Sequence, residues 1–255
     1  MSSSPGRPKT DPAYRLASKF WFHHVSHKLN KKAKALELHF MGLDDQTEGV
    51  DVSRPKLWEK YQSGRACPKI KGTRSKPSIV ERVEQEVPFS SRVFTHSLWR
   101  LLSNEPLDMD DLREIYLSLH SDIRKLLVIQ TFRKPDFFWR TPATVIDLKK
   151  LIIQGGILEE DAELWLKLDA AAALLAMVRE AEIRQDMRQH IDALNAWDVL
   201  AHILLRTAPF IRVYHELQSL IVQRFLSVRY FHGGEHHKWT IQPARKWEVK
   251  FSIDI

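Results

Sequence analysis

The sequence contains little cysteine, little glycine and no long apolar run. A single cysteine, Cys67, stands among 255 residues, which excludes an intramolecular disulfide and any cysteine-based zinc cluster. Nine glycines are few for this length and argue against a glycine-rich nucleotide-binding fold. The longest apolar run, at residues 170–178, is too short to span a bilayer. We therefore expect no membrane segment and, because no secretory signal is visible, a cytoplasmic protein.

Motifs of the common enzyme classes are missing as well. The chain has no P-loop, no Gly-x-Ser-x-Gly, no His-Glu-x-x-His and no dinucleotide fingerprint, so we expect a non-enzymatic protein without a cofactor. His23 and His27 have the spacing of two ligands on one helix face, but no acid or cysteine stands nearby and we expect no metal site. Glu248 and Lys250 lie on an alternating stretch that resembles the Glu-x-Lys end of restriction-type nuclease cores, where carboxylates hold Mg²⁺. A metal-dependent nuclease therefore stays open as an alternative.

Charge is divided unevenly along the chain. The formal net charge is +7, and residues 1–104 contain 19 lysines and arginines against 10 acidic residues, whereas residues 105–255 contain 20 against 22. An excess of positive charge attracts polyanions such as nucleic acids. We therefore expect the N-terminal part to contact nucleic acid, although exposed basic side chains also occur simply as the solvated faces of helices.

Helical signals fill the N-terminal part. Residues 1–10 contain little that can be buried and are expected to form a disordered arm. Asp11 as N-cap and Pro12 at the first helical position begin a helical stretch over residues 13–41, with a break near Asn30. The aromatic residues of this stretch are expected to pack in the core.

The following part has the same helical character. A helix over residues 94–102 closes the basic part, and a new helix begins after Asp108, whose side chain can accept a backbone N–H. Further helices are expected at residues 122–131, at 142–155, at 159–206 with a hinge within 189–194, and at 209–225.

The end of the chain changes its period. Residues 246–255 alternate polar and apolar side chains, as a half-buried strand does, and residues 228–231 and 238–241 are expected to pair with it. The predicted fold is therefore mainly α and multi-helical. It has a basic helical module at residues 11–104 and a helical domain at residues 105–255 that ends in a small antiparallel β element. We expect the second domain to mediate homo-oligomerisation or to bind a protein partner.

The most basic stretch lies between two tryptophan-containing helical signals. Residues 54–82 contain nine lysines and arginines but only two acidic residues. A short helix is expected from Ser53, as N-cap, up to Gly64, which supplies a left-handed stop. A second helix is expected to begin near Ser78. Trp58 is expected to be buried against the flanking helices.

Part of this stretch has a familiar pattern. Residues 57–68 read Leu-Trp-Glu-Lys-Tyr-Gln-Ser-Gly-Arg-Ala-Cys-Pro. An aromatic residue, a Gly-Arg pair and a proline at these spacings resemble the end of the recognition helix and the following turn in Cro/C1-type helix-turn-helix repressors. The resemblance covers residues 53–68 and implies DNA, rather than RNA, as the ligand.

We therefore predict a non-enzymatic nucleic-acid-binding protein. The expected contact residues are Arg54, Lys56, Lys60, Gln62, Arg65, Lys69, Lys71, Arg74 and Lys76. Those on the helix would approach base edges, and those that follow it would meet phosphates. The alternative from another class is an adaptor subunit whose basic face binds an acidic protein partner.

Overall fold

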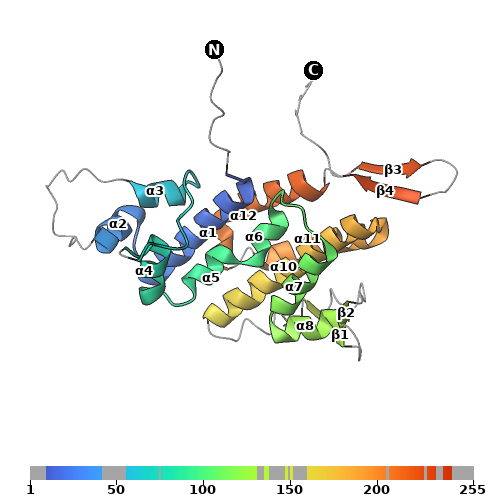
Figure 1. The fold of residues 1–255 in the computed structure, drawn as a ribbon, viewed down its shortest axis with the longest axis horizontal. Coiled ribbons are helices and arrows are strands. Elements are labelled where there is room, and N and C mark those ends of the chain that lie inside the picture. Colours follow the sequence, from blue (N-terminus) through green and yellow to red (C-terminus); the bar gives the residue numbers. More distant parts are fainter. Residues whose placement is uncertain are drawn as a thin grey trace, which may run out of the picture.

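The chain is mainly helical, as predicted (Figure 1). The computed structural model describes residues 10–41, 56–74, 76–130, 135–137, 147–148, 150–151, 160–204, 207–226, 229–233 and 238–242. The expected disordered arm at residues 1–10 therefore lies almost entirely outside the described residues, as does most of the helix expected at residues 142–155.

The first two helices follow the signals in the sequence. α1 (Pro12–Leu29) begins where the Asp11 carboxylate accepts a backbone N–H of the first turn at 2.8 Å, with Pro12 at the first position. It ends at Asn30, which takes a left-handed φ of 50°. α2 (Ala33–Met41) follows. The predicted break near Asn30 is confirmed.

Four short helices come next. They are α3 (Leu57–Gln62), α4 (Ile79–Glu86), α5 (Ser90–Thr95) and α6 (Ser97–Leu102). α4 begins as predicted, because the Ser78 and Glu81 side chains exchange the two hydrogen bonds of a capping box. α3 begins later than predicted, because Lys56 takes a left-handed φ of 49°, which a right-handed helix cannot contain. The expected N-cap, Ser53, lies outside the described residues.

Two expected helix boundaries in the next part are wrong. The helix predicted over residues 94–102 is split at His96, which is extended with a ψ of 141° and whose ring accepts the backbone N–H of Leu98. The helix expected over residues 122–131 ends early and gives way to a strand. The elements here are α7 (Met109–Ser118), which begins after Asp108 as predicted, α8 (Ser121–Leu127), and the antiparallel pair β1 (Val128–Gln130) and β2 (Pro135–Phe137).

The last part contains α10 (Glu160–Arg184), the longest of the described helices. Its other elements are α11 (Met187–Leu204), α12 (Phe210–Ile221), the π-helical turn η1 (Val222–Leu226), β3 (Arg229–Gly233) and β4 (Lys238–Gln242). The hinge expected within residues 189–194 is wrong, because the chain turns at Gln185, which takes a left-handed φ of 57°. β3 and β4 pair antiparallel, with Arg229 opposite Gln242. The strand expected at residues 246–255 lies outside the described residues.

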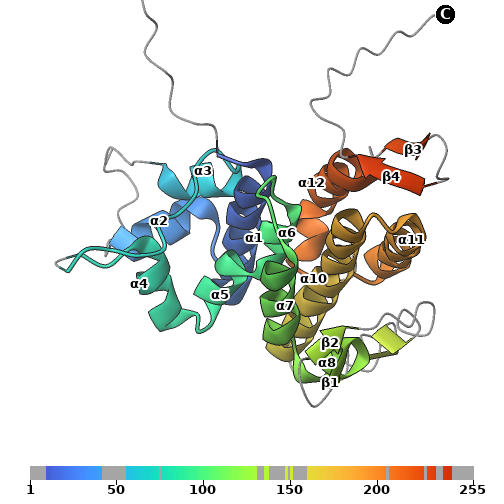
Figure 2. The same cartoon turned by 45° about the vertical axis from the view of Figure 1, so that its right-hand side comes forward.

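One hydrophobic core extends from α1 to η1. α1 contacts α5, α6 and α12, while α10 contacts α6, α7 and α11. Phe20 of α1 meets Trp99 of α6 at 5.3 Å and Phe210 of α12 at 4.8 Å between ring centroids, both edge to face. In Figure 2, α6 lies between α1 and α10. Helices on the two sides of residue 104 therefore share this core.

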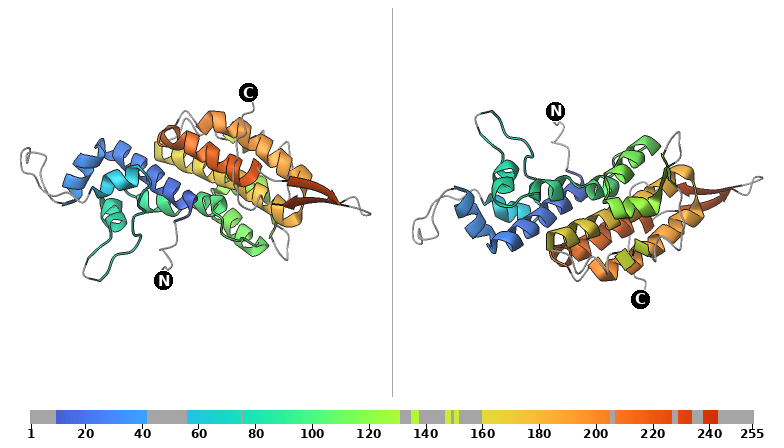
Figure 3. Two further views of the ribbon diagram at one scale, coloured as in Figure 1. Left: turned by 90° about the horizontal axis from the view of Figure 1, so that it is seen from above. Right: turned by 90° about the horizontal axis from the view of Figure 1, so that it is seen from below.

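The molecule is elongated (Figure 3). α2, α3 and α4 occupy one end, and the β3–β4 hairpin lies at the other end. The loop that leads into α4 projects sideways from the helices. Among the described helices, none is long and apolar enough to cross a membrane.

Candidate nucleic-acid interface

Trp58 packs α3 against the hydrophobic core. Its buried ring stacks between Trp21, at 5.5 Å between ring centroids, and Phe40, at 5.3 Å. At the start of α3, the Leu57 N–H donates to the Glu37 carboxylate at 2.8 Å. The burial predicted for Trp58 is confirmed, and it determines which face of α3 points into solvent.

The solvent face of α3 carries two of the predicted contact residues, Lys60 and Gln62, and Lys56 immediately precedes the helix. All three are exposed. Gly64 then ends the helix with a φ of 66°, as predicted. A Cβ at this glycine would lie 3.2 Å from the Arg15 carbonyl oxygen, so the turn passes close to α1. Arg65 follows and is exposed.

Two side chains tie this turn to α1. Ser18 Oγ donates to the Ala66 carbonyl at 2.8 Å, and Cys67 Sγ donates to the Tyr14 carbonyl at 3.4 Å. Burial raises the pKa of the Cys67 thiol. Because a nucleophilic cysteine needs a lowered pKa, this cysteine is a packing residue.

Residues 69–77, termed the basic loop, are fastened to the start of α4. Glu81 Oε2 accepts the backbone N–H groups of Ser78, at 2.6 Å, and of Gly72, at 2.9 Å. These two donors lower the pKa of Glu81, that of Ser78 having the larger effect. Ser78 Oγ also donates to the Ile70 carbonyl at 2.9 Å. Two hydrogen bonds, at Gly72 and Ile70, therefore join the loop to the start of α4.

A backbone bridge closes the tip of the basic loop. The Thr73 N–H donates to the Lys76 carbonyl at 2.9 Å, and the Lys76 N–H donates to the Thr73 carbonyl at 3.2 Å. Gly72 is required beside this bridge, because a Cβ there would lie 2.3 Å from the Lys76 carbonyl oxygen and 2.5 Å from the Ser78 nitrogen. Arg74 stands at the tip, between the bridged residues.

The cations in and beside α3 and in the basic loop form no ion pair with a described residue, although the positive charge of Lys71 contributes to the lowered pKa of Glu81. These cations are Lys56, Lys60, Arg65, Lys69, Lys71, Arg74 and Lys76, all exposed, and with Gln62 they are termed the basic surface. Several cations elsewhere form ion pairs, as in Arg113–Asp110 at 2.6 Å, Lys125–Asp122 at 2.7 Å and Arg100–Asp111 at 2.6 Å. A cation without a carboxylate partner is available to an external anion.

The structure brings the two parts of the basic surface to the same end of the molecule. α3 and the loop that runs into α4 both lie at that end (Figures 1 and 3). Arg54, the remaining predicted contact residue, lies outside the described residues.

Three residues that shape this region were not predicted. Arg15 lies exposed on α1 beside the turn after α3, and nothing in a helical pattern indicates which arginine will face a distant turn. Gly72 and Glu81 hold the basic loop. The Ser78–Glu81 spacing is that of a capping box and could have identified Glu81 as a structural acid.

A buried histidine–aspartate pair lies outside the basic surface. His96 Nε2 and Asp169 Oδ1 are 3.0 Å apart, and both side chains are buried. The other ring nitrogen accepts the Leu98 N–H at 3.2 Å, and the other carboxylate oxygen accepts the His120 N–H at 2.8 Å. The polar atoms of both groups are thus engaged in hydrogen bonds that join α6, α10 and the loop after α7, and both side chains also line a cavity of about 420 Å³.

The nuclease alternative falls outside the described residues, because Glu248 and Lys250 do so. Within the described part of the chain, no group of three or more histidine, cysteine, aspartate or glutamate side chains could hold a metal ion. Comparisons with protein-family models, with curated proteins and with solved structures find no match for this chain.

Proposed function

We propose that this chain is a non-enzymatic nucleic-acid-binding protein whose basic surface contacts the phosphates of duplex DNA. The observation that supports the proposal is the absence of ion pairs, among the described residues, for the seven exposed cations of that surface. Such cations release condensed counterions from DNA when they meet phosphates, which supplies affinity for any sequence. In this proposal, residues 11–104 form the binding module. Residues 105–255 form an oligomerisation or partner domain that ends in a small antiparallel β element.

The proposed resemblance to Cro/C1-type repressors adds base reading. α2 and α3 pack against each other, and Lys60 and Gln62 point into solvent from α3. In a groove, these two side chains would approach base edges while the lysines of the basic loop meet phosphates.

Contacts to bases and contacts to phosphates differ in how strongly their loss depends on the DNA sequence. Gln62→Ala is expected to cost about 1–3 kcal/mol on a preferred duplex and little on a random one, whereas Lys69→Ala should weaken both equally. The preferred duplex comes from selection out of a random pool. Enrichment of no sequence would contradict base reading and leave only the phosphate contacts.

An adaptor that binds an acidic protein is the second candidate. Ile70 stands between Lys69 and Lys71 in the basic loop, and 45% of its surface is exposed. An apolar side chain between two cations fits an acidic protein surface with an apolar centre better than it fits a phosphate backbone.

A titration of the full chain distinguishes the two candidates. The ligands are random-sequence duplex DNA, duplex RNA and polyglutamate, and the variant combines Lys60→Ala, Arg65→Ala and Lys69→Ala. The matched control removes the same charge elsewhere, through Arg113→Ala, Lys125→Ala and Arg188→Ala. We expect the first variant to bind DNA about tenfold more weakly or worse, because contacts to charged groups are strong, and the control to bind like the original chain. Equal losses in both variants would contradict a local interface. Binding to polyglutamate without binding to nucleic acid would establish the adaptor.

A further inference from the structure

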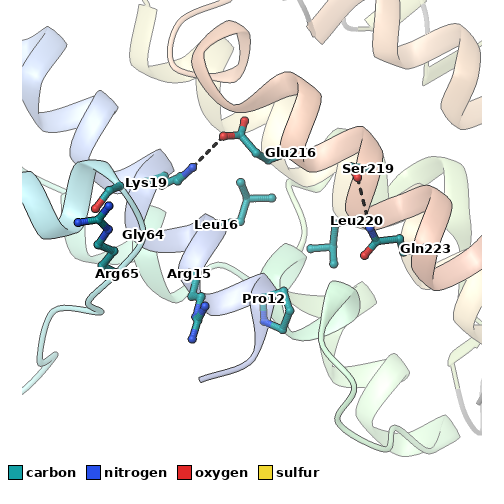
Figure 4. Close-up of a pocket in the computed structure, with 11 residues that line it drawn as sticks. Pro12, Arg15, Leu16, Lys19, Gly64, Arg65, Glu216, Ser219, Leu220 and Gln223 are labelled. Carbon is teal, nitrogen blue, oxygen red and sulfur yellow. Dashed lines mark hydrogen bonds and ion pairs between the residues drawn. The ribbon is translucent and has the colours of Figure 1, made fainter. Parts of the chain in front are cut away.

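A cavity of about 320 Å³ lies between α1, α12 and the turn after α3 (Figure 4). α1 contributes Arg15 and Lys19 to its lining, and the turn contributes Arg65. α12 contributes Glu216 and Leu220. Its volume is at the lower end of the range found for small-molecule pockets, so the cavity suits a small ligand.

The lining of this cavity carries two positive charges that no described residue balances. Lys19 Nζ and Glu216 Oε1 are 2.7 Å apart and neutralise each other across one end of the cavity (Figure 4). The hydrogen bond from Lys19 lowers the pKa of Glu216, so the pair is charged at neutral pH. Arg15 and Arg65 are exposed and form no ion pair with any residue that the structure describes. The lining of the cavity therefore has an excess of two positive charges, those of Arg15 and Arg65.

The close approach of the turn to α1 brings the two arginines to one cavity. A Cβ at Gly64 would lie 3.1 Å from Lys19 Cε and 3.2 Å from the Arg15 carbonyl oxygen, so a larger residue would push Arg65 away from α1. Leu16 of α1 and Leu220 of α12 form the apolar part of the lining, between the polar side chains of the same two helices (Figure 4). The cavity thus combines cationic side chains with an apolar patch.

We propose that this cavity binds a small molecule that carries a phosphate group on an apolar or aromatic body. Two guanidinium groups match the double negative charge of a phosphate monoester, and each can donate two parallel hydrogen bonds to it. A single carboxylate would balance only one of the two charges. The body of the ligand would lie against Leu16 and Leu220. This proposal does not depend on nucleic-acid binding, although Arg65 belongs to both sites.

Calorimetric titration of the full chain with phenyl phosphate tests the proposal. Phenol and inorganic phosphate are the matched probes that lack one half of the ligand. We expect phenyl phosphate to bind more tightly than inorganic phosphate and phenol not to bind, because the cationic side chains and the apolar patch act on different parts of the ligand. Absence of saturable binding by phenyl phosphate would overturn the proposal.

Two variants locate the binding. Arg15→Gln should weaken phenyl phosphate about tenfold, because it removes one of the two charged donors. Ser219→Trp, on the exposed face of α12 at the rim, should fill the cavity and abolish binding. Arg188→Gln removes an exposed arginine of α11 and serves as the control, with no expected effect. Binding that is unchanged in both cavity variants would overturn the assignment to this cavity.

Competition separates a small phosphate ester from a backbone phosphate of DNA. Because Arg65 belongs to both sites, Arg15 is the residue that separates them: if the cavity takes a small molecule, Arg15→Gln should weaken phenyl phosphate and leave duplex affinity unchanged. If the duplex displaces phenyl phosphate and Arg15→Gln weakens both ligands alike, the cavity is part of the DNA interface and the small-molecule proposal is overturned. Failure of phenyl phosphate to bind would leave the nucleic-acid proposal untouched.

Discussion

At the scale of single residues, Trp58 connects the core to the basic surface. Its ring is stacked between Trp21 and Phe40, so truncation would remove contacts on both faces. We expect Trp58→Ala to lower the free energy of unfolding by about 3–5 kcal/mol, as large-to-small changes of buried aromatic residues do. Trp58→Phe should cost less, because one ring remains in the stack. Urea denaturation measures both, and an alanine variant as stable as the original chain would contradict the anchoring role.

The surroundings of Glu182 predict a pH dependence of the stability of the fold. Arg179, Arg224 and His190 face it at 3.5, 3.6 and 3.9 Å. Burial nevertheless raises the pKa of Glu182 to about 7, and burial lowers the pKa of His190 to about 4. The contribution of Glu182 to stability is therefore complete below pH 4.5 and is lost as the pH rises through about 7. The contribution of His190 to stability is complete above pH 6.5 and is lost as the pH falls through about 4.

Glu182→Gln isolates the first of these two effects. The glutamine stays neutral, so the variant should gain stability relative to the original chain as the pH rises from about 5 to about 8, by roughly 2 kcal/mol. Urea denaturation at both pH values gives the difference. If the two proteins differ by the same amount at both, the carboxylate does not titrate in this range.

The burial of three acidic residues could not be predicted from the sequence. Glu37, Asp169 and Glu180 are almost fully buried, yet each reads as an ordinary helical surface residue. Their partners are distant in the chain: Glu37 accepts from Leu57, and Tyr116 donates to Glu180 at 2.8 Å. Such pairings arise from tertiary packing and leave no local signal.

At the scale of elements, the basic loop has a defined conformation that depends on Gly72. Gly72→Ala would place a Cβ against two backbone atoms, which cannot move as a flexible side chain can. We expect the loop to open while the fold persists, with a stability loss of about 1 kcal/mol if the capping box of α4 is disturbed. DNA affinity should fall toward that of a chain without the loop cations. Thr73→Ala, beside the same bridge, is the control, and a Gly72→Ala chain that binds DNA normally would show that loop shape is unimportant.

Helix beginnings with a side-chain cap were predictable, whereas two breaks between helices were not. Asp11, Ser78 and Asp108 cap their helices as expected, because a cap is a local hydrogen bond between nearby residues. His96 breaks the expected helix before α6 through its contact with Asp169, 73 positions away. The turn at Gln185 uses a left-handed conformation without a glycine or asparagine to signal it.

At the scale of the whole molecule, the sequence predicts that positive charge is concentrated before residue 104, but it does not predict how these cations are arranged in space. Composition places the excess of cations before residue 104. The structure shows that Arg100 of α6, Arg113 of α7 and Lys125 of α8 form ion pairs, whereas the cations of the basic surface form none with the described residues. The shared core also joins the two predicted parts, so tests of function require the full chain.

The salt dependence of duplex binding tests the central claim most directly. Each phosphate contact on B-DNA contributes about 0.9 to the slope of log affinity against log salt. Replacing Lys69, Lys71, Arg74 and Lys76 by glutamine should therefore flatten the slope by about 3–4, while Arg113→Gln, Arg124→Gln, Lys125→Gln and Arg188→Gln in one control chain should leave it unchanged. Equal slopes for the original chain and the loop variant would contradict the claim that this surface holds phosphates.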